Sequence, residues 1–163
     1  MKSFQVKDLA FQTMLASIYV VLVFGFSFMS FETIQFRIAE VLLIFVFFDK
    51  KSVIGLTLGT FVANWLMSPF GLVDALFGSL ATVLSLLAMI LLIKHKRIAL
   101  VMPALFNGLV IGLMLVYFLD LPFLPTFGWI FLGEFVVVMG LGYPLYRVLR
   151  KNQAFIEFFN EKR

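Results

Sequence analysis

The most restrictive feature of this sequence is a stretch of 23 residues without a charge, from Leu9 to Phe31. An α-helix rises ~1.5 Å per residue, so ~20 apolar residues cross a hydrocarbon layer of ~30 Å. Comparable stretches recur along the chain, and we expect spans at residues 9–30, 36–48, 52–68, 73–93, 98–119 and 127–147. The first stretch exceeds the ~7–15 apolar residues of a signal-peptide core, so we expect it to stay in the protein.

Composition supports this reading. Hydrophobic residues make up 63% of the 163 residues and charged residues only 13%, about half the charged share of soluble domains. The net charge of +4 does not indicate nucleic-acid binding, because the basic residues flank apolar segments and form no stripe with interleaved aromatic residues. We predict an all-α membrane protein, a compact bundle of six transmembrane helices in one domain (1–150), followed by a short basic or amphipathic tail (151–163).

Charged residues separate the spans and orient them. Asp49, Lys50 and Lys51 divide the short second and third segments, because one fused helix would bury three charges at its centre. Basic residues favour the cytoplasmic side. If both termini are cytoplasmic, 12 of the 13 basic residues lie inside and only Arg37 lies outside. The inner residues are then Lys2, Lys7, Lys50, Lys51, Lys94, Lys96, Arg97, Arg147, Arg150, Lys151, Lys162 and Arg163.

Small residues recur at four-residue spacing in two of the spans. They are Gly55, Gly59 and Ala63 in the third, and Ala104, Gly108 and Gly112 in the fifth. Small faces let helix backbones approach closely in lipid, where packing drives association. We expect these faces to serve plain helix packing.

Polar side chains inside hydrocarbon are costly, so each indicates a functional site. With the predicted topology, most lie in the outer half of the bundle: Arg37, Glu40, Asn64, Asp74, Ser79, Thr82 and Glu134, with Asn107 near mid-depth. The inner half is almost purely apolar. A channel or proton relay needs polar groups along its whole path. This pattern instead predicts a polar cup that opens outward, which suits a small polar ligand.

The residue types in the cup indicate the kind of ligand. Glu40, Asp74 and Glu134 face a single Arg37, which favours a cation or a heterocycle rich in hydrogen-bond donors. A carboxylate accepts two parallel N–H donors, such as a guanine-like edge presents. Aromatic side chains near the outer loops could stack on a flat ring; these are Phe36, Trp65, Phe70 and Trp129.

Each of these residues also has a purely structural explanation. Arg37 and Glu40 could pair with each other at i and i+3, and Asp74 could cap the fourth span. Asn64 and Asn107 could form interhelical hydrogen bonds. The aromatic residues could belong to an interfacial belt, above all Trp129. Glu134 is the hardest to explain in this way, because nothing nearby in its span satisfies it.

The sequence does not indicate an enzyme. It contains no metal-ligand spacing, no P-loop and no Ser/His/Asp set. Its one histidine, His95, lies in a Lys-His-Lys-Arg turn on the side opposite the carboxylates. We therefore expect neither a catalytic residue nor a metal or cofactor. If transport requires ATP, another protein must hydrolyse it.

Several motifs in order resemble the QueT family, the queuosine-precursor S components of energy-coupling factor (ECF) transporters. The resemblance is strongest from about 34 to 85 and covers most of the chain. Its motifs are Ile34-Gln35-Phe36-Arg37-Ile38-Ala39-Glu40, the run from Gly55 to Gly59, Ala63-Asn64, Asp74, Phe77-Gly78-Ser79-Leu80-Ala81-Thr82, Gly133-Glu134 and Tyr143-Pro144-Leu145.

The resemblance implies a multi-pass protein of the bacterial plasma membrane that binds a deazapurine ligand, either a 7-deazaguanine precursor or queuine. Its other partners would be membrane lipid, a transmembrane coupling subunit and two cytoplasmic ATPases. Glu134 or Glu40 would hold the pyrimidine edge and Asp74 the amine. Asn64 would complete the hydrogen bonding and Arg37 would orient Glu40. We also assign Asn107, Ser79, Trp65 and Phe36 to the substrate site.

One part of the family pattern is missing. Many S components carry Ala-xxx-Ala on the cytoplasmic part of the first helix, where the coupling subunit docks. Here Met14 follows Ala10 at that spacing, and Thr13 and Ser17 form the nearest small pair. We assign the coupling contact to Ala10, Thr13 and Ser17.

Three other functions are alternatives to this prediction. An S component for a different vitamin would have nearly the same sequence features. A membrane scaffold of the cell-shape type would need no polar cup. An intramembrane enzyme lacks its reactive groups.

Overall fold

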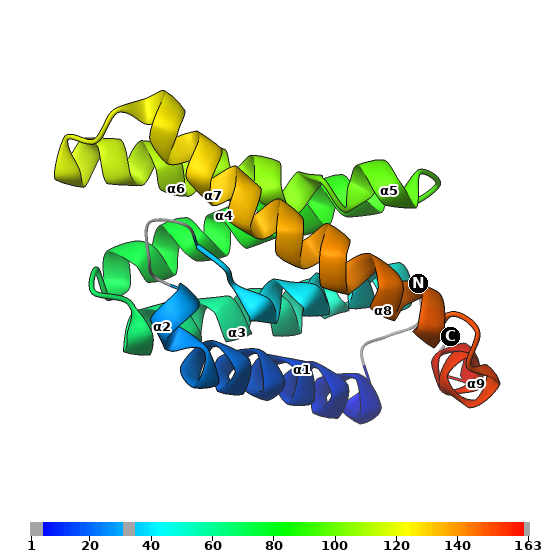
Figure 1. Cartoon of the computed structure of the whole chain (residues 1–163). Coiled ribbons are helices and arrows are strands. Elements are labelled where there is room, and N and C mark those ends of the chain that lie inside the picture. Colours follow the sequence, from blue (N-terminus) through cyan, green and yellow to red (C-terminus); the bar gives the residue numbers. More distant parts are fainter. Residues whose placement is uncertain (1–4, 31–34, 162–163) are drawn as a thin grey trace.

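The computed structural model describes residues 5–30 and 35–161, and every regular element in those ranges is a helix (Figure 1). In chain order the elements are α1 (Val6–Gly25), α2 (Ser27–Ser30), the 3₁₀ helix η1 (Ile38–Phe47), α3 (Ser52–Met67), α4 (Leu72–Leu91), α5 (Lys96–Ala99), α6 (Met102–Leu119), α7 (Phe123–Val137), the π-helical segment η2 (Val138–Gly142), α8 (Tyr143–Leu149) and α9 (Gln153–Glu161).

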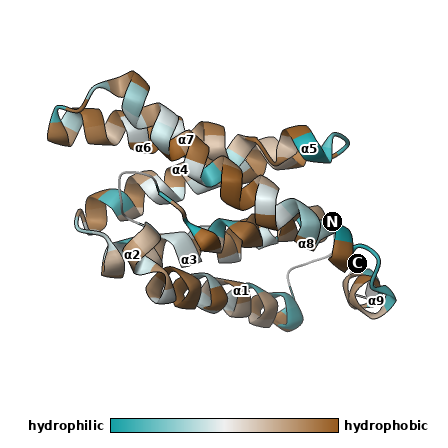
Figure 2. Ribbon diagram, viewed as in Figure 1, coloured by the Kyte–Doolittle hydropathy of each residue, from teal (hydrophilic) through white to brown (hydrophobic). Residues whose placement is uncertain are grey.

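All six predicted segments are helical, and four of them are long and apolar enough to cross a membrane. Those four are Val6–Gly25, Leu72–Leu91, Lys96–Leu119 and Phe123–Leu149. The remaining two, η1 and α3, are shorter apolar helices. Hydrophobic residues dominate the long helices, and hydrophilic ones gather near α5, α8 and α9 (Figure 2). The part of the predicted tail that the structure describes forms α9.

The helices form a bundle with two distinct ends. α1 packs on α3, α3 on α4, α4 on α6, and α6 on α7. The α3–α4 and α6–α7 turns lie at one end, which we call the Pro69 end. α5, α9 and the start of α1 lie at the other, which we call the α9 end (Figure 1). η1 runs through the middle and contacts α1, α3, α4, α7 and η2.

The second predicted segment departs from expectation, because it is a 3₁₀ helix and not an α-helix. A 3₁₀ helix rises ~2.0 Å per residue, so the ten residues of η1 cover about 20 Å instead of the ~15 Å of an α-helix. It is also the narrower helix. A short segment enclosed by five other elements gains both reach and fit from this geometry, and eight of its ten residues are buried.

The small-residue faces pack as predicted. A Cβ on Gly55 would lie 2.9 Å from Gln12 Cα of α1, and one on Gly59 would lie 3.0 Å from Ala16 Cα. In α6, a Cβ on Gly108 would lie 2.9 Å from the Phe127 ring of α7. These contacts leave no space for a side chain, so both faces serve close backbone approach.

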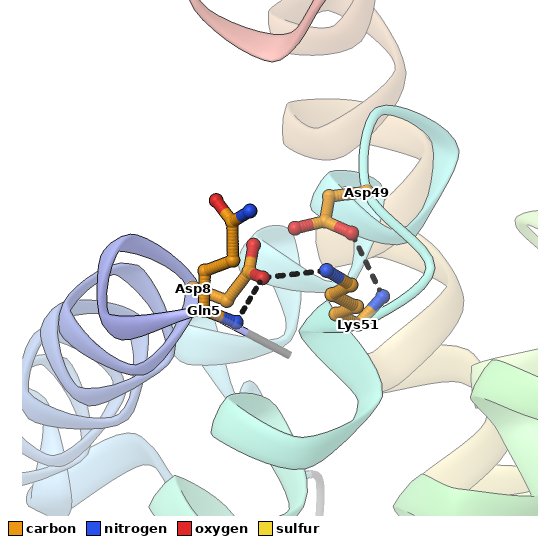
Figure 3. A network of polar contacts seen from close by, with 4 residues as sticks. All are labelled: Gln5, Asp8, Asp49 and Lys51. Carbon is orange, nitrogen blue, oxygen red and sulfur yellow. Dashed lines mark hydrogen bonds and ion pairs between the residues drawn. The ribbon is translucent and has the colours of Figure 1, made fainter. Parts of the chain in front are cut away.

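Polar contacts tie α1 to the start of α3 at the α9 end. Lys51 Nζ lies 2.5 Å from Asp8 Oδ2, and the Lys51 backbone N–H donates to Asp49 Oδ1 at 2.9 Å (Figure 3). One turn along α1, Gln12 Oε1 accepts a hydrogen bond from the Gly55 backbone N–H at 3.3 Å. These residues secure the ends of two packed helices.

Aromatic rings of α9 pack against α1 and the end of η1 at the α9 end. Phe159 of α9 lies 5.3 Å from the ring of Phe11 in α1, and Phe155 lies 5.0 Å from the ring of Phe48 just after η1. α9 therefore covers apolar side chains at the ends of α1 and η1, although the buried Asp8, Gln12 and Ser52 show that this end is not purely apolar.

Gly133 allows α7 to approach the extended segment that leads into η1. A Cβ at this position would overlap the Gln35 carbonyl oxygen, a backbone atom that cannot rotate away. We expect Gly133→Ala to lower the stability of the protein by roughly 1–3 kcal/mol, the usual cost of overpacking. The measurement is thermal unfolding in detergent.

Gly140 provides the matched control in the same stretch of chain. A Cβ there meets nothing within 4 Å, so Gly140→Ala should leave stability unchanged or raise it by up to ~1 kcal/mol. Equal melting temperatures for the two variants would contradict the close approach at Gly133.

Candidate functional site

The site is organised around Arg37, which precedes η1 and is fully buried. Its guanidinium interacts electrostatically with the carboxylates of Asp74, Glu134 and Glu40 and with the phenol of Tyr19. These residues come from α4, α7, η1 and α1. Charges far from water need opposite charges and hydrogen bonds around them. We call these five residues the Arg37 cluster.

Tyr19 and Glu40 form the shortest described hydrogen bond of the cluster. The Tyr19 hydroxyl donates to Glu40 Oε1 at 2.5 Å, and both residues are fully buried. Glu40 Oε2 and both carboxylate oxygens of Glu134 have no hydrogen-bond partner among the described residues. The cluster therefore has buried acceptor atoms that a donor-rich molecule could satisfy.

Asn64 fixes the start of α4 against α3. Its Nδ2 donates to the Asp74 carbonyl oxygen at 3.1 Å, and Gly78 makes room for the amide. The predicted interhelical hydrogen bond of Asn64 is thus confirmed. The alternative that Asp74 caps the helix is wrong, because the cap residue is Gly71 and no side-chain cap hydrogen bond forms. The Asp74 carboxylate remains available, with Oδ1 unpartnered in the described chain.

A cavity of about 350 Å³ lies at the Pro69 end, between the α3–α4 turn and the α6–α7 hairpin. Its polar walls include Gln35 and Asp74, and its aromatic walls are Phe70 and Trp129. The other lining residues are Ser68, Pro69, Met114, Leu115, Leu119, Leu121, Pro122, Pro125 and Thr126. Asp74 belongs both to this cavity and to the Arg37 cluster, so it connects the two.

Comparison with known proteins identifies the family of this chain. Residues 9–151 match the family described as QueT transporter. A queuosine precursor transporter QueT from Lactococcus lactis is 33% identical over 150 residues, which cover 83% of this chain and 88% of that protein. No solved structure matches the chain significantly. The chain belongs to the QueT transporter family. It is a multi-pass membrane protein of the cell membrane and a transport protein.

The structure brings together the charged residues that the sequence predicted for a QueT site. Arg37, Glu40, Asp74 and Glu134 are all buried, and the three carboxylates lie near enough to the guanidinium to interact with it electrostatically. Only Asp74 among them lines the cavity, whereas Arg37, Glu40 and Glu134 are fully buried and do not line it, so the open cup that we predicted from all four residues is not what the cavity shows. That these residues bind the substrate stays a prediction.

The uncharged polar residues that we predicted for the site differ in whether they have hydrogen-bond partners. Asn107 is buried in α6, and neither its amide nitrogen nor its amide oxygen has a partner in the described part of the chain. Ser79 donates to the Ala75 carbonyl oxygen within α4. Thr82 donates to Thr60 of α3 at 3.3 Å. Ser79 and Thr82 therefore already have partners within the helices, whereas Asn107 does not.

The aromatic residues divide into two groups. Phe70 and Trp129 line the cavity. Trp65 is 55% exposed and packs beside Phe61, and neither Trp65 nor Phe36 lines the cavity. The geometry therefore favours Phe70 and Trp129, and not the two aromatic residues that we assigned to the site, for stacking on a flat ring.

The residues assigned to the coupling contact share the exposed face of α1. Ala10, Thr13 and Ser17 are all exposed, whereas Phe11 and Leu15 on the opposite face are buried in the bundle. This face is open to a partner helix, and the contact itself stays a prediction.

Sequence reasoning missed Tyr19 and the role of Gln35. Tyr19 lies near the middle of a charge-free span, where a hydroxyl needs a buried partner, and this position was the available signal. Gln35 lines the cavity, and its Oε1 has no partner among the described residues. It lies two residues before Arg37 within the family motif from Ile34 to Glu40, and that position was the available signal.

The Tyr19–Glu40 hydrogen bond yields a test of the cluster. Tyr19→Phe leaves a buried carboxylate oxygen without its donor, which should cost roughly 1–3 kcal/mol of stability. In a double-mutant cycle, Tyr19→Phe should cost less stability in a Glu40→Gln background than in the unaltered protein, because the two changes remove the same interaction. Thermal unfolding in detergent measures both effects.

Tyr117→Phe is the control, since Tyr117 is 80% exposed. If Tyr19→Phe is no more destabilising than Tyr117→Phe, the hydrogen bond does not contribute to the stability of the bundle.

Proposed function

We propose that this protein is the substrate-binding S component of an ECF-type ABC importer, and that it captures a queuosine precursor, of 7-deazaguanine type or queuine, from outside the cell. Membership in the QueT family and the name of the Lactococcus lactis relative, a queuosine precursor transporter, support the ligand class. The observation that carries the proposal is the set of three buried carboxylates around one guanidinium, joined to a cavity through Asp74.

The cavity chemistry suits a flat, donor-rich heterocycle. A volume of about 350 Å³ lies at the small end of the ~300–1,000 Å³ typical of ligand pockets. We infer that the ring lies between Phe70 and Trp129. Asp74 receives the cationic amine of the ligand, and Glu134 or Glu40 receives its pyrimidine edge. Asn64 keeps the start of α4 in place, and Arg37 orients Glu40.

The proposed topology has six spans and both termini in the cytoplasm. η1 and α3 would be the two short spans that complete it. The Pro69 end, with the cavity, would then face outward, and the basic residues near α5, α8 and α9 would face inward as charge bias favours. Lys2, Lys162 and Arg163, which contribute to that bias, and Ile34 of the family motif lie outside the described residues.

Transport would require further subunits. In the proposed complex, a transmembrane coupling subunit docks on the face of α1 that carries Ala10, Thr13 and Ser17, and two cytoplasmic ATPases supply the energy. Residues 1–150 would form the binding domain and 151–163 its cytoplasmic tail, in which α9 packs against α1 through Phe11 and Phe159.

Ligand binding can be measured on the purified protein with a panel of deazapurines and B vitamins. A ligand at 100 times its Kd should stabilise the native state by ~2.7 kcal/mol. We expect stabilisation by a deazapurine, and we expect Glu134→Gln to weaken its binding at least about tenfold, because a charge-assisted hydrogen bond is worth roughly 1.5–3 kcal/mol.

Asp120→Asn is the matched control. Asp120 is an exposed carboxylate at the same end, it does not line the cavity, and Asn tolerates its left-handed backbone. If a B vitamin stabilises the protein and no deazapurine does, the proposed substrate class is wrong. Unchanged deazapurine affinity in Glu134→Gln would remove Glu134 from the site.

The coupling contact needs a separate test, because binding and transport are different steps. Thr13→Trp adds bulk to the exposed face of α1, so it should reduce uptake of the ligand into cells severalfold and leave binding in detergent unchanged. Leu80→Trp adds similar bulk to an exposed position on α4 and should affect neither. Equal uptake by both variants would place the docking face elsewhere.

A further inference from the structure

A second cavity, of about 490 Å³, lies at the α9 end, on the opposite side of the molecule from the substrate cavity. The α4–α5 turn and α8 form its walls. Its lining residues are Lys94, His95, Lys96, Arg97, Ile98, Tyr143, Tyr146, Arg147 and Arg150. No acidic side chain lines it, and five of the nine residues are lysines or arginines. We call this cavity the basic groove.

Two of the five basic side chains of the groove, Lys96 and Arg97, contact aromatic rings. Lys96 Nζ lies 4.3 Å from the centroid of the Phe47 ring. Arg97 lies over the Tyr143 ring at 5.6 Å, and its Nε donates to the Tyr143 hydroxyl at 3.2 Å. None of the five cations forms an ion pair with an acidic residue of the described chain. The groove therefore concentrates positive charge that no acidic side chain of the described residues pairs with.

An apolar recess adjoins the groove and shares Arg147 with it. This recess, of about 270 Å³, is lined by Pro144, Arg147, Val148 and Lys151, and its surface is almost entirely apolar. Val148 and Ile98, beside the basic residues, are 65% and 54% exposed. Charge and exposed hydrocarbon thus meet where the apolar helices end, which is the level of lipid headgroups.

We propose that the basic groove binds the phosphate of an anionic phospholipid, with an acyl chain lying against Pro144 and Val148. Basic pockets between transmembrane helices are suited to anionic headgroups. A free phosphate would use the cations but would leave the recess empty, whereas a phospholipid occupies both. Arg147 faces both parts and is the residue expected to bridge headgroup and chain.

The test uses the full-length protein in a neutral detergent, with thermal unfolding as the readout. The probes are dioctanoyl phosphatidylglycerol, dioctanoyl phosphatidylcholine and inorganic phosphate. We expect phosphatidylglycerol to bind most tightly. Arg147→Gln/Arg150→Gln should weaken its binding by roughly 10- to 30-fold, from the value of a basic side chain near an anionic lipid surface.

Lys7→Gln/Lys50→Gln is the charge-matched control, because both lysines are exposed at the same end and outside the groove. It should change the affinity less than twofold. Equal binding of the two lipids, equal effects of the two double variants, or equally strong binding of inorganic phosphate would each overturn the proposal.

Two further measurements keep the test independent of folding and of the proposed function. In the unaltered protein, phosphatidylglycerol binding should weaken as salt concentration rises, because salt screens exposed charges; a salt-independent affinity would contradict the site. Deazapurine binding at the opposite end should be the same in Arg147→Gln/Arg150→Gln and in the unaltered protein, so failure of one site is distinguishable from failure of the other.

Discussion

A buried guanidinium constrains the rest of this structure. An ion removed from water carries a penalty of several kcal/mol even after relaxation, which exceeds a typical interhelical hydrogen bond in lipid. Arg37 therefore requires acidic and phenolic groups around it. They come from four elements that are distant in sequence, through Tyr19, Glu40, Asp74 and Glu134. Each element must present its residue at the same depth, so the cluster fixes how α1, η1, α4 and α7 align.

The 3₁₀ form of η1 aligns one residue of the cluster with the apolar core. In a 3₁₀ helix, side chains three residues apart lie in one line, and Glu40, Leu43 and Val46 are all fully buried. In an α-helix each step of three residues would rotate the side chain by about 60°, so Val46 would lie about 120° around the helix from Glu40. The 3₁₀ geometry therefore lets one narrow segment present Glu40 near its start and apolar side chains farther along, on a single line. Arg37 precedes the helix with a non-helical ψ of 87°.

The sequence predicts much of this architecture because lipid imposes simple rules. Apolar length predicted the helical segments, small residues predicted the close faces of α3 and α6, and the cost of burial predicted that Arg37, Glu40, Asp74 and Glu134 belong together. The 3₁₀ form of η1 and the π-helical segment η2 could not be predicted, because apolar side chains give the same pattern in any helix type. The sequence also could not predict which side of a helix faces the cavity. Trp65 and Trp129 were grouped because both lie near the predicted outer loops, but in the structure only Trp129 lines the cavity.

Buried polar groups at the two ends of the bundle differ in how far the fold satisfies them. At the α9 end, Asp8 accepts a hydrogen bond from Lys51 and Gln12 accepts one from the Gly55 backbone N–H, so both residues join α1 to the start of α3, although Gln12 Nε2 has no partner among the described residues. Toward the Pro69 end, both carboxylate oxygens of Glu134 lack a hydrogen-bond partner in the described chain. An unsatisfied buried carboxylate destabilises the fold, so a group that serves packing alone is usually satisfied or replaced by an apolar side chain. The unsatisfied state of Glu134 therefore supports the proposed binding role.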